Sequence, residues 1–230
     1  MGGRYDTLIV PTDLTPMVDS VWHQHSDPDL AAPPTRILPA LYGNLIINRG
    51  DRYEHAPPRP LTVPHVSLHG IRTRAIGAVA TGRTDLIIFN LRPWAVAALA
   101  AMPAAELTDQ VLDLDPDRVS DGAAWVEGPV AAAVDRIFDR LRALTAGRGD
   151  LRLLASVTDR LACLPVAAAA AELGMTRRHL QRIMNARMGV SPKRFQQLRR
   201  YQAALPALRR GEHGAQVAAA LGYVDQAHLN

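Results

Sequence analysis

One short motif occurs twice in the last third of the chain, and it limits the fold more than any other feature of the sequence. Residues 170–175 read AAELGM and residues 218–223 read AAALGY, so Gly174 and Gly222 stand 48 residues apart. In each copy an alanine-rich stretch, which favours a helix, ends in Leu-Gly. Glycine readily adopts the left-handed backbone conformation of a tight turn after a helix. The repeat therefore predicts two helix-turn-helix units.

The helix expected after the first turn has two different faces. Thr176 can cap its start, because a threonine hydroxyl accepts a hydrogen bond from the free backbone N–H groups there. Three apolar side chains share the face that would pack on the preceding helix: Leu180, Ile183 and Met184. The outward face carries Arg177, Arg178, Gln181 and Arg182. Arginine and glutamine can reach guanine and adenine edges in the DNA major groove, although a helical hairpin with a solvated basic face would show the same pattern.

A long helix is expected between the two units. Ser191 can cap it, Pro192 suits its first position, and an amphipathic stretch continues to Arg210. Pro206 lies within that stretch, where it is expected to remove one hydrogen bond and kink the helix. Further cations flank the first unit: Arg187, Lys193 and Arg194. Two reading helices joined in this way can address successive major grooves on one face of DNA.

The charge of the chain is divided between two regions. Residues 1–150 hold 14 arginines and 18 acidic residues, a net charge of −4, whereas residues 151–230 hold 12 cations and four acidic residues, a net charge of +8. Together they make the +4 of the whole chain. A basic region behind an acidic remainder is typical of a polyanion-binding module attached to another domain. Two glycines in residues 145–150 mark the expected boundary, with a first domain at 1–146 and a second at 150–230.

The first domain is expected to be a small mixed β domain with helices, which together with an all-α C-terminal domain makes an α+β protein. Apolar runs at 45–47 and 86–89 are bounded by proline and glycine clusters, as strands are, and this character extends to about residue 120. A short helix is expected over 94–102, and a further helix over 129–145. In the second of them, apolar residues recur at steps of four and three, a pattern that either packs on its own domain or forms a dimer seam: Val130, Val134, Ile137, Leu141 and Leu144.

Several spaced motifs of the C-terminal region resemble the DNA-binding domain of the AraC family of bacterial regulators. They are the Leu-Gly turn, residues 179–182, residues 189–192, the basic linker helix and residues 221–229, in the order of the family. The resemblance implies that Arg178, Gln181 and Arg182 contact bases, and that Gln226 and Ala227 take the corresponding place in the second unit. The chain given stops soon after, so we expect a truncated second recognition helix and a weaker second reader.

The N-terminal region is also similar, around residues 37–39 and 103–109, to a domain of unknown role found on some AraC-type regulators. The combined resemblance implies a sequence-specific DNA-binding transcription regulator, modulated through an N-terminal sensing or dimerisation domain. Its implied partners are double-stranded DNA, RNA polymerase, a small-molecule effector and a second copy of the chain. The alternative is a regulator that binds a ligand or a protein and holds DNA weakly.

Other classes of function have little support in the sequence. A single cysteine, Cys163, excludes an internal disulfide and a cysteine-based zinc cage. His23 and His25 would share one face of a strand, but no glutamate follows at close spacing, so we expect surface or core histidines and no metal. No nucleotide-binding loop or nucleophile motif indicates an enzyme or a cofactor. Without a long apolar stretch or a signal-peptide pattern, we expect a cytoplasmic protein and no membrane partner.

Overall fold

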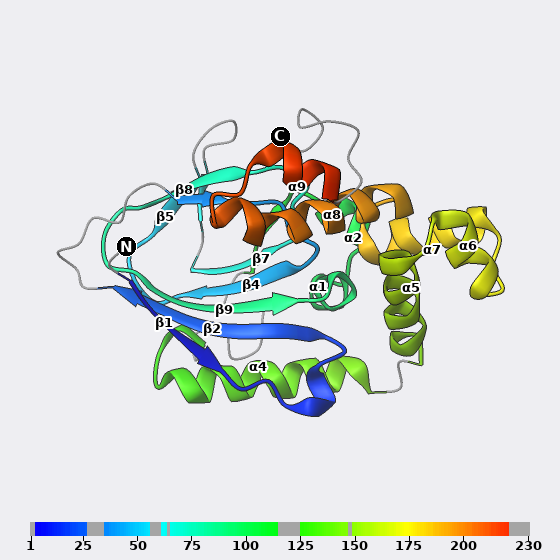
Figure 1. The fold of residues 1–230 in the computed structure, drawn as a ribbon. Helices are drawn as coiled ribbons and strands as arrows, with labels where there is room; N and C mark the ends of the chain where they lie inside the picture. The colour runs from blue at the N-terminus through cyan, green and yellow to red at the C-terminus, as the bar shows by residue number, and fades with distance from the viewer. Residues whose placement is uncertain are drawn as a thin grey trace.

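The first half of the chain is built on two antiparallel β-sheets (Figure 1). The computed structural model describes residues 3–26, 35–55, 61–63, 65–114, 125–146 and 149–220. The larger sheet has the order β1 (Gly3–Leu8), β2 (Val18–Ser26), β9 (Asp85–Leu91), β4 (Gly43–Asn48), β7 (Val66–His69) and β10 (Val111–Asp113). The smaller sheet has the order β3 (Thr35–Ile37), β8 (Ile76–Ala80), β5 (Tyr53–His55) and β6 (Leu61–Thr62). The apolar runs at 45–47 and 86–89 are confirmed as strands β4 and β9, which pair with each other in the larger sheet.

The larger sheet separates two kinds of side chain, because successive residues of a strand point to opposite faces. In β4, Leu45 and Ile47 are fully buried in the apolar core, whereas Asn44 and Ile46 line a cavity on the other face. The same alternation divides β9 into the core residues Ile87, Phe89 and Leu91 and the cavity residues Leu86, Ile88 and Asn90. One face therefore carries a dry core, and the opposite face looks toward the smaller sheet.

The helix α4 (Val130–Thr145) covers the apolar face of the larger sheet (Figure 1). The ring of Phe138 packs edge-on against Phe89 of β9, with ring centroids 5.8 Å apart. Two further side chains of this helix are fully buried in the same core: Ile137 and Leu141. The predicted helix is confirmed, with Pro129 in the N-cap position, and its apolar stripe packs within the chain instead of standing free as a dimer seam.

The remaining helices follow the sequence pattern closely. The first half also contains η1 (Thr12–Leu14), α1 (Pro93–Ala100), which confirms the alanine-rich helix, and α2 (Ala104–Leu107). The second half is helical where the structure describes it, with α5 (Leu151–Cys163), α6 (Val166–Glu172), α7 (Arg177–Met188), α8 (Pro192–Arg209) and α9 (Gly214–Ala220). The helix α8 continues through Pro206 for one more turn. None of the described helices combines the length and the apolar character needed to cross a membrane.

The two halves of the chain are docked on each other and share one continuous apolar core. Helices α1 and α2 pack against α7. The Thr108 hydroxyl donates a hydrogen bond to the backbone carbonyl of Gly189 at 2.9 Å, and the Arg194 guanidinium donates to the backbone carbonyl of Thr73, also at 2.9 Å. Both ends of the segment between α7 and α8 are therefore tied to the N-terminal half.

Candidate nucleic-acid interface and ligand cavity

The turn before α7 has the geometry that its sequence predicts. Gly174 has a φ of +63°, in the left-handed region, and the backbone N–H of Met175 returns to the carbonyl of Ala170 at 2.8 Å. The Thr176 side chain accepts a hydrogen bond from the backbone N–H of His179 at 3.1 Å, so the predicted N-cap is confirmed. With its start capped and the side chains of Leu180 and Met184 fully buried, α7 is held rigidly and its opposite face is left outward.

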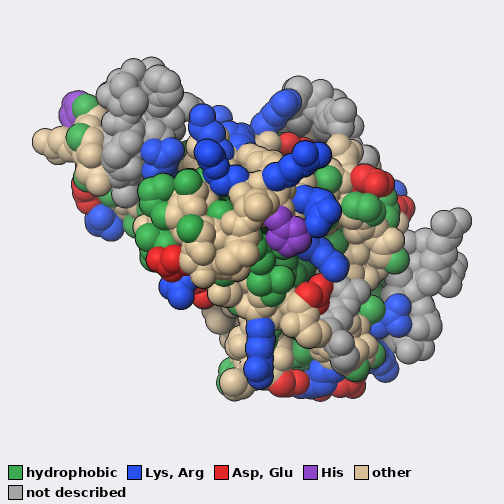
Figure 2. All heavy atoms as spheres, turned by 90° about the vertical axis from the view of Figure 1, so that its right-hand side faces the viewer, with side chains coloured by type: hydrophobic (Ala, Val, Ile, Leu, Met, Phe, Trp, Pro, Cys, Tyr) green, Lys and Arg blue, Asp and Glu red, His purple; other side chains and the backbone are tan. Residues whose placement is uncertain are grey.

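Four polar side chains at helical spacing form what we call the contact face of α7. They are Arg178, Gln181, Arg182 and Asn185, all exposed, and they line a hollow that also includes Ala105 of α2. Arg177 is exposed beside them. Figure 2 shows Lys and Arg side chains gathered on the side of the molecule where α6 and α7 lie. The arrangement presents donors and positive charge outward from one helix, as major-groove recognition requires.

Side chains of the contact face form hydrogen bonds with each other and with the neighbouring His179 of α7. The Arg182 guanidinium donates to Nδ1 of His179 at 2.9 Å, and the Gln181 amide donates to Oδ1 of Asn185 at 3.1 Å. His179 and Asn185 were missed by the sequence reasoning. The steps of three and four from Arg178 to Asn185 were the signal that could have revealed Asn185.

The flanking cations have different environments. Lys193 is exposed, but Arg187 forms an ion pair with Asp150 at 3.1 Å, and Arg194 is engaged with the Thr73 carbonyl. Two of these three predicted DNA contacts are therefore occupied by contacts within the chain. The predicted residues of the second unit, Gly222, Gln226 and Ala227, lie outside the described residues.

A cavity of about 300 Å³ lies between the two sheets, and we call it the sandwich cavity. Aromatic and aliphatic side chains make up much of its wall: Tyr5, Trp22, Ile37, Tyr42, Ile46, Tyr53, Leu86 and Ile88. Three polar side chains in the wall, Asn44, Arg72 and Asn90, are almost completely buried. A largely apolar pocket with a few convergent polar groups is the usual form of a small-molecule site.

A chain of hydrogen bonds holds Arg72 in the cavity wall. Its guanidinium donates to Oδ1 of Asn44 and, at 3.3 Å, to Nδ1 of His69. The Asn44 amide donates to Oδ1 of Asn90 at 2.6 Å, which continues the chain toward β2. Since Nδ1 of His69 accepts from Arg72, its Nε2 carries the proton and donates to Oγ of Ser67 at 2.9 Å. The network fixes the position of the guanidinium before any ligand arrives.

Burial keeps the titratable neighbours of Arg72 uncharged. Burial and the nearby Arg72 charge lower the pKa of His55 to about 4 and hold the pKa of His69 well below its ordinary value. Burial also raises the pKa of Tyr53 above its ordinary range. Although burial lowers the pKa of Arg72 as well, a guanidinium stays protonated in proteins. Arg72 is therefore the buried positive charge of the cavity wall, whose other arginine, Arg36, is exposed.

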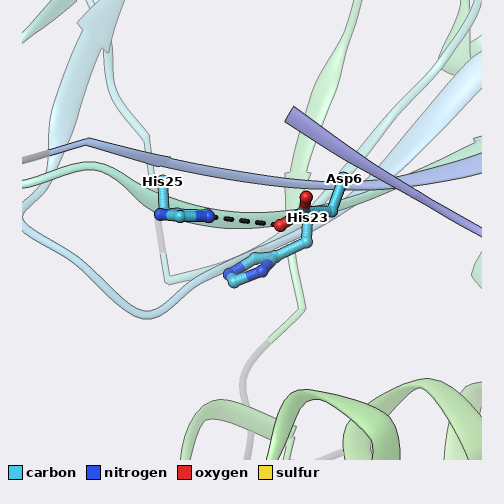
Figure 3. A group of neighbouring side chains, drawn as sticks. All are labelled: Asp6, His23 and His25. Carbon is cyan, nitrogen blue, oxygen red and sulfur yellow. Dashed lines mark hydrogen bonds and ion pairs between the residues drawn. The ribbon is translucent and has the colours of Figure 1, made fainter. Parts of the chain in front are cut away.

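Three side chains of kinds that can bind metals, Asp6, His23 and His25, lie close together on the face of the larger sheet opposite the sandwich cavity (Figure 3). His23 and Asp6 are cross-strand partners in β2 and β1, and Nε2 of His25 lies 3.2 Å from a carboxylate oxygen of Asp6. One nitrogen or oxygen from each of the three side chains lies within 4.8 Å of the other two. The pairing of β1 with β2 brings the Asp6 carboxylate next to the two histidines, although it lies far from them in the sequence. These residues could hold a divalent metal after side-chain rotation.

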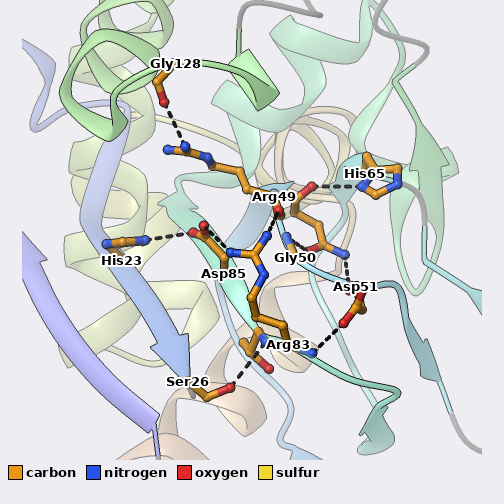
Figure 4. A network of polar contacts seen from close by, with 11 residues as sticks. His23, Ser26, Arg49, Gly50, Asp51, His65, Arg83, Asp85 and Gly128 are labelled. Carbon is orange, nitrogen blue, oxygen red and sulfur yellow. Dashed lines mark hydrogen bonds and ion pairs between the residues drawn. The ribbon is translucent and has the colours of Figure 1, made fainter. Parts of the chain in front are cut away.

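A network of polar contacts holds the His23 side chain in place (Figure 4). Its Nε2 lies 2.9 Å from Oδ1 of Asp85, whose other oxygen accepts from Arg83 at 3.4 Å. Arg83 also donates to the backbone carbonyl of Arg49 at 2.7 Å, and the Arg49 guanidinium donates to the carbonyl of Gly128 at 2.7 Å. The network links the loop before β9 with the end of β4 and the segment before α4, so it has a structural role whether or not a metal binds.

Comparison with known proteins matches two separate segments of the chain to two different families. Residues 169–230 match a helix-turn-helix domain family, and residues 9–113 match a domain of unknown function, DUF6597. No curated protein matches. Among solved structures, ToxT from Vibrio cholerae is similar with 9% identity, covering 100% of this chain and 92% of that chain at a TM-score of 0.45. ToxT with a bound unsaturated fatty acid is similar with 11% identity, covering 100% and 89% of the two chains at a TM-score of 0.45. The chain therefore carries a helix-turn-helix domain over residues 169–230 behind an N-terminal DUF6597 domain over residues 9–113.

Proposed function

We propose that this protein is a sequence-specific DNA-binding transcription regulator whose N-terminal domain, residues 1–146, senses a ligand. The observation that carries the proposal is the contact face of α7, which is exposed, basic and rigidly held by a capped turn inside a helix-turn-helix domain. Arg178, Gln181 and Arg182 supply the base contacts, and Arg177 and Lys193 are placed to meet phosphates. RNA polymerase and a second copy of the chain are the further partners we propose.

Modulation would act through the contacts between the halves. The hollow beside the contact face includes Ala105 of α2, so the N-terminal half borders the surface that would approach DNA. Arg194 and Gly189 bond to the same half from either side of the turn between α7 and α8. A ligand that shifts α2 or Thr73 would therefore change how the recognition helix is presented.

Footprinting on a selected operator tests the proposal. Arg182→Ala is expected to cost about 1–3 kcal/mol on the specific site and to relax the sequence preference there. Arg140→Ala is the matched control, because it removes one exposed arginine from α4 on the far side of the larger sheet. An equal loss on specific and random DNA would reduce Arg182 to a phosphate contact, and equal effects of the two substitutions would refute the assigned interface.

A second candidate function is a ligand- or protein-binding regulator that holds DNA weakly. It is favoured by the ion pair of Arg187 with Asp150 and by the engagement of Arg194 with Thr73, which withdraw two cations from DNA. A salt titration separates the two candidates. A DNA reader loses affinity steeply as salt rises, because phosphate contacts release counterions, whereas the second candidate binds weakly at any salt concentration tested.

A further inference from the structure

Arg72 is a buried cation that forms no salt bridge with any residue that the structure describes, and the Asp109 carboxylate acts on it only from beyond salt-bridge distance. It is only 8% exposed, and its polar partners are the neutral side chains of Asn44 and His69. Its Nε is buried with no hydrogen-bond partner. A guanidinium has five N–H groups, and the bonds to Asn44 and His69 use two of them, while Arg72 also forms part of the wall of the sandwich cavity.

Such an arrangement is costly in the free protein. Moving a charge from water into an apolar surrounding is strongly unfavourable unless an opposite charge and hydrogen bonds compensate. Asn44 and His69 supply dipoles but no negative charge. An anionic group in the cavity would supply an opposite charge at close range and accept a hydrogen bond from a guanidinium N–H that the two existing bonds leave free.

We infer that the sandwich cavity binds a small apolar molecule with a single acidic group, held by that group on Arg72. This inference names the ligand class of the sensing domain in the proposed function, and its regulatory meaning rests on that function. The apolar body of the ligand packs against the aromatic and aliphatic wall, which includes Trp22, Tyr53 and Ile88. The cavity volume lies at the small end of the usual range of ligand pockets, about 300–1,000 Å³.

The other polar groups of the wall favour one acidic group over two. Asn44 and Asn90 are already bonded to each other, and the charged side chains of the wall besides Arg72 are the exposed Arg36 and the carboxylate Asp51, whose charges cancel. His55 and His69 lie near Arg72 but stay neutral near pH 7, so they add no second positive charge. The charges of Arg36, Arg72 and Asp51 leave the wall with one net positive charge, which matches a monoanion.

Arg72 is followed in the chain by Thr73, which contacts the DNA-binding half. The backbone N–H and the hydroxyl of Thr73 donate to the two carboxylate oxygens of Asp109 at 2.7 and 2.6 Å. The carbonyl of Thr73 accepts from Arg194 of α8. A ligand bound to the Arg72 guanidinium therefore acts next to Thr73, the residue whose carbonyl is hydrogen-bonded to α8.

Isothermal titration calorimetry on the full chain without DNA tests the inference. The probes are benzoate, cinnamate and para-tert-butylbenzoate, each paired with its neutral primary amide, and acetate as an anion without an apolar body. At least one acid is expected to bind about 10-fold or more tightly than its amide and than acetate. Acids that bind no better than their amides, or no binding by any of the three acids, overturn the inference.

Two variants locate the site. Arg72→Met removes the charge at similar length and is expected to abolish the preference for acid over amide, whereas Arg74→Met, an exposed neighbour, is expected to leave it intact. If Arg72→Met does not fold, Ala78→Phe, which fills the cavity from β8 and keeps Arg72, is expected to lose binding of the acids. Acid binding that survives in the folded variants refutes the site. A chain that footprints on DNA but ignores the acids refutes this inference alone, and a chain that binds the acids but not DNA refutes only the proposed function.

Discussion

Gly189 connects the end of the recognition helix to the N-terminal half, and replacing it with alanine tests how firmly the two are docked. Its φ is +74°, a conformation that costs alanine roughly 1–2 kcal/mol. A Cβ there would lie 2.4 Å from the Thr108 hydroxyl and 2.5 Å from the backbone carbonyl of Ala104, so α2 would have to move. Overpacking of this kind costs about 1–3 kcal/mol, and loss of the Thr108 hydrogen bond about 1 kcal/mol more. We expect Gly189→Ala to lower the free energy of unfolding by about 3–6 kcal/mol.

Gly174→Ala is the matched control for this substitution. Gly174 has a φ of +63°, but nothing lies within 4 Å of the added Cβ, so only the backbone term of roughly 1–2 kcal/mol applies. Urea unfolding followed by far-ultraviolet circular dichroism measures both variants. The difference between them isolates the contact between the halves and is expected to be at least about 2 kcal/mol. Losses that agree within about 0.5 kcal/mol would refute tight docking of α7 on α2.

Three further perturbations test the core, the cavity and the contact between the halves. Phe138→Ala removes the ring that packs on the larger sheet and is expected to lower the free energy of unfolding by about 3–5 kcal/mol in the same urea assay. The depressed pKa values of His55 and His69 mean that the unfolded chain takes up protons first as the pH falls below about 6.5. The free energy of unfolding is therefore expected to fall toward pH 4, by up to about 1.4 kcal/mol per pH unit for each histidine. Arg194→Ala removes the hydrogen bond to Thr73 and is expected to cost about 1 kcal/mol of stability and to weaken any effect of a bound acid on DNA affinity.

Each of these expectations has a clear contrary result. A loss below about 1 kcal/mol for Phe138→Ala would mean that α4 is held mainly by other contacts. Stability that is flat between pH 6.5 and 4 in the wild type, and equal in a His55→Gln variant, would mean that these histidines are not neutral in the fold. An Arg194→Ala variant in which a bound acid changes DNA affinity as it does in the wild type would exclude the Thr73 contact as the route of coupling.

Local chemistry explains why much of the helical part could be predicted from the sequence. The conformation of Gly174 and the caps of Thr176 and Ser191 depend on residues within one helical turn of one another. The sandwich cavity could not be predicted in this way. Arg72 and Asn44 are brought together by strand pairing, and nothing in the local sequence indicates that a lone arginine becomes buried.

The grouping of Asp6 with His23 and His25, and the partners of the cations beside α7, could not be predicted from the sequence either. Asp6 joins His23 through the register of β1 on β2, which sequence spacing does not reveal. Arg187 and Arg194 are basic residues in a basic region, and the sequence predicts DNA contacts for both. Their partners, Asp150 and the Thr73 carbonyl, become visible only when the docking of the two halves is known.

The alternation of core and cavity residues along the central strands has a consequence for how such a sensor can diversify. In β4 and β9, residues of the apolar core alternate with residues that line the cavity. Substitutions at Ile46 or Ile88 would reshape the cavity while Leu45, Ile47 and Phe89 keep the fold intact. Ligand preference and folding stability thus depend on separate sets of positions in the same strands. Selection could therefore change the recognised ligand one substitution at a time while every variant along the way remains folded.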